Sequence, residues 1–215
     1  AMDAKTGTCW IIGAGEFTPR GFSRAVEDFV IAADAGLKHM EALGLAPDLL
    51  VGDLDSLGKA PEGLPLLRHP VEKDDTDMEL ALNEGAARGY RRFLLYGGSG
   101  GRIDHFLANL QLIAHASREG LTAILVCPDF NAYAVTDDTL RLPGAPKGTL
   151  LSVFCLGEDA QGISLSGLKY PLNNARLTAF HALGVSNAHT GAPVEICVQS
   201  GTLLVLDYAP GGIKG

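Results

Sequence analysis

The chain has 215 residues, of which 47% are hydrophobic and 20% are charged, and its formal net charge is -8. This length is enough for one large or two small domains with a buried core. A nucleic-acid-binding surface needs clustered lysine and arginine, and the acidic chain has no basic block. No apolar run approaches the roughly 20 residues of a membrane-spanning helix. We therefore expect neither nucleic acid nor a membrane as a partner.

The four cysteines lie far apart in apolar segments and form no CxxC pair. This spacing favours buried, reduced thiols over disulfides or zinc ligands. The first residues lack the basic start and long apolar stretch of a signal peptide. We therefore expect a cytoplasmic protein.

In the first 127 residues, short apolar runs alternate with longer stretches that have helical periodicity. The near-continuous apolar runs, typical of strands buried on both faces, are 9–13, 29–33, 49–52, 93–96 and 123–127. Apolar residues at spacings of three and four predict helices over 37–43, 76–88 and 103–118. We predict an α/β domain with a mainly parallel sheet over residues 1–128, with ligands at the carboxyl ends of its strands.

After Pro128 the chain consists of short strand-like runs separated by Gly, Pro and Asp. These runs are 132–135, 139–142, 150–154, 162–165, 194–198 and 202–206. The pattern contains no helical period of useful length and is typical of a β-sandwich or barrel. We predict a second, all-β domain over residues 129–215.

Two acidic clusters stand out in the first domain. Asp53 and Asp55 follow a buried strand in the sequence GDLDS, and the sequence KDDTD at 73–77 begins a predicted helix. Turn formation and helix capping explain part of both clusters. Carboxylates at this density repel one another unless a cation lies among them, so a magnesium site is the competing interpretation.

A glycine-rich turn, GGSGGRIDH at 97–105, joins a predicted strand to a predicted helix. It matches neither the Walker A nor the GxGxxG pattern. Free N–H groups at a helix start and the guanidinium of Arg102 are nevertheless suited to phosphate oxygens. A flexible loop without a ligand is the alternative, and four glycines followed by Arg, Asp and His make that alternative the weaker one.

Two further strand ends carry weaker signals. The sequence GAGE at 13–16 is either a second turn that approaches phosphate or a simple strand exit. Asp34 follows the second strand and either contacts a nucleotide or caps the next helix.

These motifs occur in the order found in one family. The chain resembles thiamine pyrophosphokinase over nearly its whole length, through the GDLDS turn, the KDDTD helix start and the GGSGGRIDH turn. A further signature in the second half, GLKYPL at 167–172 followed by GVSN at 184–187, is similar to the thiamine-binding region of the family. The resemblance implies a homodimer in which a β-sandwich contributes to the thiamine pocket.

The resemblance also implies roles for individual residues. Asp53, Asp55 and Asp77 would bind Mg²⁺ and the polyphosphate, and Asp77, Arg102 and Asp104 would be the catalytic residues. The residues expected to contact ATP are Asp34, Lys73, Thr76, Gly98, Gly100, Gly101 and Arg102. Ser186 and Asn187 would hydrogen-bond the aminopyrimidine of thiamine, and Tyr170 would offer it an aromatic face.

The implied reaction converts ATP and thiamine into AMP and thiamine diphosphate. The thiamine hydroxyl would attack the β-phosphorus of ATP, with Asp77 or Asp104 orienting the hydroxyl or accepting its proton. Another Mg²⁺-dependent phosphoryl-transfer enzyme and a non-catalytic nucleotide or vitamin sensor are the alternatives. The presence of every metal-binding carboxylate speaks against the sensor.

Overall fold

The structure is a computed structural model that describes residues 4–52, 63–67, 75–209 and 211. It divides into two compact units, Ala1–Leu112 with Leu121–Pro128 and Ile113–Gly120 with Asp129–Gly215. Helix α3 (Ile103–Arg118) contributes residues to both units. The domain boundary expected after residue 128 stays a prediction.

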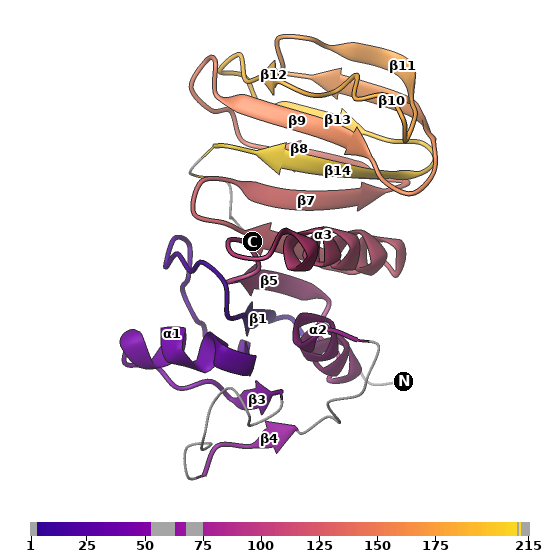
Figure 1. The fold of residues 1–215 in the computed structure, drawn as a ribbon. Helices are drawn as coiled ribbons and strands as arrows, with labels where there is room; N and C mark the ends of the chain where they lie inside the picture. Colours follow the sequence, from indigo (N-terminus) through magenta and orange to yellow (C-terminus); the bar gives the residue numbers. More distant parts are fainter. Residues whose placement is uncertain (1–3, 53–62, 68–74, 210, 212–215) are drawn as a thin grey trace. The chain divides into compact units, whose positions relative to one another are not determined.

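The N-terminal unit contains a parallel sheet with the strand order β6-β5-β1-β2-β3-β4 (Figure 1). Its strands are β1 (Thr8–Ile12), β2 (Phe29–Ala33), β3 (Leu49–Val51), β4 (Leu66–Leu67), β5 (Arg92–Tyr96) and β6 (Thr122–Val126). In β1, β2, β5 and β6 every residue after the first is buried. Burial on both faces is why these strands have continuous apolar sequences, and it confirms the predicted parallel α/β sheet.

In the part of the chain that the structure describes, three α-helices lie between strands of this sheet. A 3-10 turn, η1 (Asp34–Gly36), leads into α1 (Leu37–Ala42), which packs against β1 and β2. Helix α2 (Asp77–Ala87) packs against β1, β2 and β3. Helix α3 has the bounds that the periodicity predicts.

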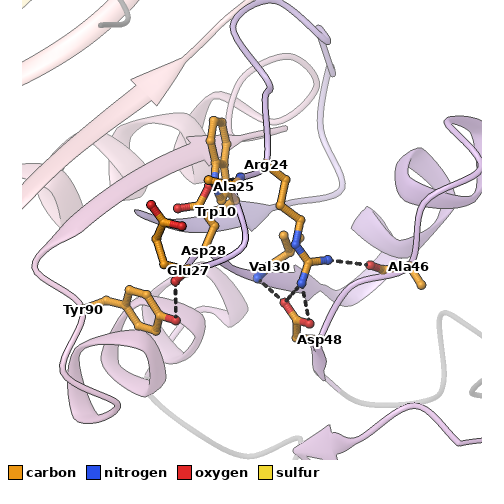
Figure 2. A network of polar contacts seen from close by, with 9 residues as sticks. All are labelled: Trp10, Arg24, Ala25, Glu27, Asp28, Val30, Ala46, Asp48 and Tyr90. Atoms are coloured by element: carbon orange, nitrogen blue, oxygen red, sulfur yellow. Dashed lines mark hydrogen bonds and ion pairs between the residues drawn. The ribbon is translucent and has the colours of Figure 1, made fainter. Parts of the chain in front are cut away.

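Two carboxylates, directly before β2 and β3, fix neighbouring segments of the sheet. Asp28 accepts hydrogen bonds from the N–H groups of Thr8 and Ala25 and from the Trp10 indole, at 2.7, 2.8 and 2.9 Å. Asp48 pairs with Arg24 and accepts the N–H of Val30 (Figure 2). Partial burial alone would raise the pKa of Asp28, but the three donors outweigh it and the pKa is lowered.

The C-terminal unit consists mainly of two antiparallel sheets, β12-β9-β14-β7 and β11-β10-β13-β8. Their strands are β7 (Asn131–Thr136), β8 (Thr139–Leu142), β9 (Leu150–Cys155), β10 (Ala160–Ser166), β11 (Leu172–Leu177), β12 (Asn187–Ala188), β13 (Val194–Cys197) and β14 (Thr202–Asp207). The predicted all-β sandwich is confirmed. The sequence pattern missed β11 and β12, as it missed β4 in the N-terminal unit.

The cysteines are all free thiols. Cys9 is buried in β1, and desolvation raises the pKa of its thiol to about 12, so it stays protonated at neutral pH. None of the helices that the structure describes is long and apolar enough to cross a membrane.

Candidate active site

A cavity of about 610 Å³ lies at the carboxyl ends of β1, β2 and β5. Its walls come from the residues that follow these strands, 13–15, 33–34 and 97–102, from 75–78 at the start of α2, and from His105 and Asn109 on α3. The volume is within the usual range for small-molecule sites. The cavity therefore occupies the position that a parallel sheet predicts for its ligand.

The segments that directly follow β1 and β5 are joined by hydrogen bonds between their backbones at this cavity. The N–H of Gly15 donates to the carbonyl of Gly97 at 2.8 Å, and the N–H of Glu16 donates to the carbonyl of Ser99 at 2.7 Å. A Cβ at Gly97, which has φ +64°, would lie 2.2 Å from the Gly13 carbonyl oxygen, and one at Gly15 would lie 2.3 Å from that of Ser99. Glycine is required at both positions because any side chain would push apart the segments that follow β1 and β5. The GAGE turn is thus part of the cavity wall.

The glycine-rich turn 97–101 leads into α3, and the cavity wall includes all five of its residues and Arg102. A 16-residue helix that begins here directs the positive end of its dipole toward the turn. Asn109, on the second turn of α3, donates from Nδ2 to the Gly98 carbonyl at 2.8 Å. The helix therefore supplies electrostatics suited to an anion and also fixes the turn itself.

Arg102 and Asp104 form an ion pair at the N-terminus of α3. Arg102 lies on the cavity wall, whereas Asp104 is not among the lining residues, and the two side chains are 73% and 61% exposed. The hydrogen bond from Arg102 lowers the pKa of Asp104 to about 2. This pairing makes Asp104 a weaker proton acceptor, and the choice between Asp77 and Asp104 as the base stays a prediction.

The start of α2 combines capping with cavity lining. The hydroxyl of Thr76 accepts the N–H of Glu79 at 3.2 Å, so Thr76 is the N-cap. Asp75, Thr76 and Asp77 all lie on the cavity wall. Capping is therefore confirmed for the described part of the KDDTD cluster, and its role in binding magnesium stays a prediction.

Asp34 also lines the cavity, from the end of β2. Its φ of +50° lies in the left-handed region, which non-glycine residues seldom adopt. Asp34, Asp75 and Asp77 together bring oxygen donors of the kind Mg²⁺ prefers to one cavity. Within residues 4–52, 63–67, 75–209 and 211, no three Asp, Glu, His or Cys side chains are placed to hold a metal. Asp53, Asp55 and Lys73 lie outside the described residues.

The predicted thiamine residues lie in the C-terminal unit. Asn187 is 3% exposed, accepts the N–H of Tyr170 at 2.9 Å and donates to the carbonyl of Tyr170 at 2.8 Å. Tyr170 is 56% exposed. Ser186 has φ +59°, and its N–H donates to the hydroxyl of Ser152 at 3.1 Å. The structure thus brings Tyr170 and Asn187 together through the backbone of Tyr170, and their contact with thiamine stays a prediction.

The cavity residues that were not among the predicted site residues include Ser99, His105 and Asn109. His105 and Asn109 are four residues apart and therefore share a face of α3, a spacing visible in the sequence. Ser99 carried a weaker signal, as the one residue with a side chain between two glycine pairs.

Two family models match the chain. Residues 24–125 match "Thiamin pyrophosphokinase, catalytic domain", and residues 137–203 match "Thiamin pyrophosphokinase, vitamin B1 binding domain". The chain is 28% identical over 163 residues to the thiamine pyrophosphokinase of Bacillus subtilis (strain 168), covering 73% of this chain and 76% of that protein.

Solved structures agree with the sequence comparison. The crystal structure of thiamine pyrophosphokinase from B. subtilis has a TM-score of 0.84 at 25% identity, covering 94% of this chain and 99% of that one. A thiamin pyrophosphokinase family protein from Enterococcus faecalis has a TM-score of 0.78 at 26% identity, with the same coverage. Yeast thiamin pyrophosphokinase, at 14% identity and a TM-score of 0.71, covers 97% of this chain and 88% of that one and shares the fold.

Proposed function

The chain belongs to the thiamin pyrophosphokinase family, and we propose that it transfers the pyrophosphoryl group of ATP to the hydroxyl of thiamine, giving thiamine diphosphate and AMP. In this proposal residues 1–128 bind ATP and the metal, and residues 129–215 bind thiamine. The match of the two family models to successive parts of the chain supports this division.

ATP places its polyphosphate in the cavity at the ends of β1, β2 and β5. The N–H groups of Gly98, Gly100 and Gly101 and the guanidinium of Arg102 bind phosphate oxygens, with Lys73 and Thr76 adding further donors. Asp34 contacts the nucleoside. The observation that carries the proposal is this wall itself, in which glycines, a helix start and an arginine face one cavity with carboxylates.

Asp53, Asp55 and Asp77 would hold Mg²⁺, and Asp77, which lies on the cavity wall, offers the kind of oxygen donor that suits such a cation. When bound, Mg²⁺ neutralises phosphate charge and makes the β-phosphorus a better electrophile. Asp77 or Asp104 orients the thiamine hydroxyl and accepts its proton. Arg102 binds the oxygens on which charge develops in the transition state.

Thiamine binds through the C-terminal unit. The exposed ring of Tyr170 packs against the substrate, and Ser186 and Asn187 bind its aminopyrimidine. The enzyme acts in the cytoplasm as a homodimer, as the family resemblance implies. Exposed apolar side chains at Leu150, Leu183 and Tyr208 support burial of this part of the unit against a second copy.

Product analysis tests the proposal. The purified protein is incubated with ATP, MgCl₂ and thiamine, and AMP, ADP and thiamine diphosphate are separated by chromatography. Equal amounts of AMP and thiamine diphosphate, formed only with both metal and thiamine, are expected. Formation of ADP or free phosphate would indicate another phosphoryl-transfer enzyme, and binding without turnover would indicate a sensor.

A further inference from the structure

The turn 97–101 contains four glycines and one serine, so Ser99 has the turn's one side chain. Ser99 lies on the cavity wall and is 8% exposed. Its hydroxyl oxygen is buried and has no hydrogen-bond partner among the described residues. A buried hydroxyl without a partner is costly, and the fold does not require one here because alanine occupies nearly the same space.

The backbone on both sides of this hydroxyl is already bonded. Asn109 holds the Gly98 carbonyl at 2.8 Å, and Glu16 holds the Ser99 carbonyl at 2.7 Å. The peptide groups around Ser99 therefore have fixed orientations, while the hydroxyl can still rotate about its side-chain bonds. This leaves a movable donor on a turn whose backbone is fixed.

The charge around Ser99 favours an anionic acceptor. Arg102 lies on the same wall, three residues further along, and the N-terminus of α3 contributes a partial positive charge beside it. Asp34, Asp75 and Asp77 also line the cavity, so a cation that they bind would add positive charge rather than compete with the hydroxyl as a donor. Phosphate oxygens are the acceptors that this combination suits.

We propose that the Ser99 hydroxyl rotates into the cavity and donates a hydrogen bond to a phosphate oxygen of the bound polyphosphate. The proposal rests on the proposed function, since it adds a binding residue to the same ATP site. Ser99 binds the substrate directly, whereas Asn109 acts as a positioning residue through Gly98.

The test measures binding of inorganic tripolyphosphate, with MgCl₂, to the wild-type chain and to Ser99→Ala and Ser99→Cys by calorimetry. A hydrogen bond to a charged group predicts binding about tenfold to 100-fold weaker for Ser99→Ala. Ser99→Cys keeps the side-chain volume but has a poor donor, so it should bind as weakly as Ser99→Ala. Ser117→Ala, at the far end of α3, is the control and should bind like the wild type.

The melting temperature without ligand separates binding from a structural role. Removing a hydroxyl that has no partner should leave the melting temperature of Ser99→Ala equal to or above that of the wild type. Tripolyphosphate binding within twofold of the wild type would overturn the proposal. A second result would also overturn it: a lowered melting temperature in Ser99→Ala together with wild-type melting temperature and binding in Ser99→Cys. The volume of the side chain, and not its hydroxyl, would then explain the effect of the substitution.

Turnover distinguishes this proposal from the proposed function. A wild-type chain that binds tripolyphosphate but forms no thiamine diphosphate would contradict the function, while the Ser99→Ala binding comparison would still decide the role of Ser99. A wild-type chain that turns over, with an unchanged KM for ATP in Ser99→Ala, would contradict the role of Ser99 alone. A wild-type chain that does not bind tripolyphosphate would overturn both.

Discussion

In the N-terminal unit, backbone groups and Asn109 hold the turn 97–101, which leaves the hydroxyl of Ser99 without a partner among the described residues. In the C-terminal unit, the side chain of Asn187 holds the backbone of Tyr170 through two hydrogen bonds. A substitution of a cavity side chain in the first region should therefore change binding or turnover more than stability. A substitution of Asn187 in the second region should change stability as well.

The largest expected effect is on turnover, in Asp77→Ala. Asp77 begins α2, where a neighbouring residue, Thr76, provides the cap, so loss of its carboxylate should leave the fold intact. We expect kcat to fall about 10³-fold, because a proton acceptor and metal ligand is lost. Steady-state AMP formation measures this effect. Glu84→Ala, which removes an exposed ion pair with Arg88 on the same helix, is the control and should keep wild-type turnover.

The next effect is on stability, in Gly97→Ala. The left-handed backbone and the contact with the Gly13 carbonyl should together lower the free energy of unfolding by about 3 kcal/mol. Gly120→Ala is a matched control, because Gly120 has φ +71° and no atom within 4 Å of an added Cβ. It should lose only about 1 kcal/mol. Urea unfolding measures the stability of both variants. Equal losses of stability would show that the segments after β1 and β5 are not in close contact.

A smaller loss of stability is expected in Asn187→Ala, about 2 kcal/mol, because the N–H and the carbonyl of Tyr170 lose their partners. Urea unfolding measures the loss, and calorimetry with thiamine measures the accompanying loss of binding. Asn173→Ala, at an exposed position of β11, should change stability by less than about 0.5 kcal/mol. If Asn187→Ala lost thiamine binding at unchanged stability, the contrast between the two regions would be wrong.

The smallest expected effect is on stability, in Asp28→Asn. It tests a carboxylate that fixes the backbone through its charge, in contrast to the neutral amide of Asn187. The pKa of Asp28 is lowered in the folded state, so its contribution to stability is complete above its unfolded pKa and is lost as pH falls through the folded value. Asp28→Asn should therefore be about 1 kcal/mol less stable than the wild type at pH 7. This difference should close in acid, as followed by urea unfolding from pH 7 to pH 2. A difference independent of pH would contradict the role of the charge.

Much of the fold could be predicted because burial on both faces leaves a continuous apolar sequence. Strands β1, β2, β5 and β6 have such sequences, and α3 has an unbroken helical period. Strand β11, with the sequence LNNARL, is half-exposed and polar, and β4 and β12 have two residues each. Such strands form because neighbouring strands offer hydrogen bonds, a tertiary effect that no local pattern records.

The cavity could be predicted in outline because parallel strands bring their carboxyl ends to one edge. Arg102, Thr76 and Asp77 were identified from their motifs, and the structure places all three on the cavity wall. The pairing of Arg102 with Asp104 and the buried hydroxyl of Ser99 depend on rotamers and on contacts between distant segments. Neither is encoded in the spacing of residues along the chain.

The central claim is that the cavity transfers a pyrophosphoryl group rather than a single phosphoryl group. The most direct measurement incubates the protein and thiamine with Mg²⁺ and ATP labelled either at the α-phosphate or at the γ-phosphate, and locates the label in the separated products. We predict that the γ label appears in thiamine diphosphate and that the α label remains in AMP. A γ label in thiamine monophosphate or in free phosphate, with the α label in ADP, would contradict the account.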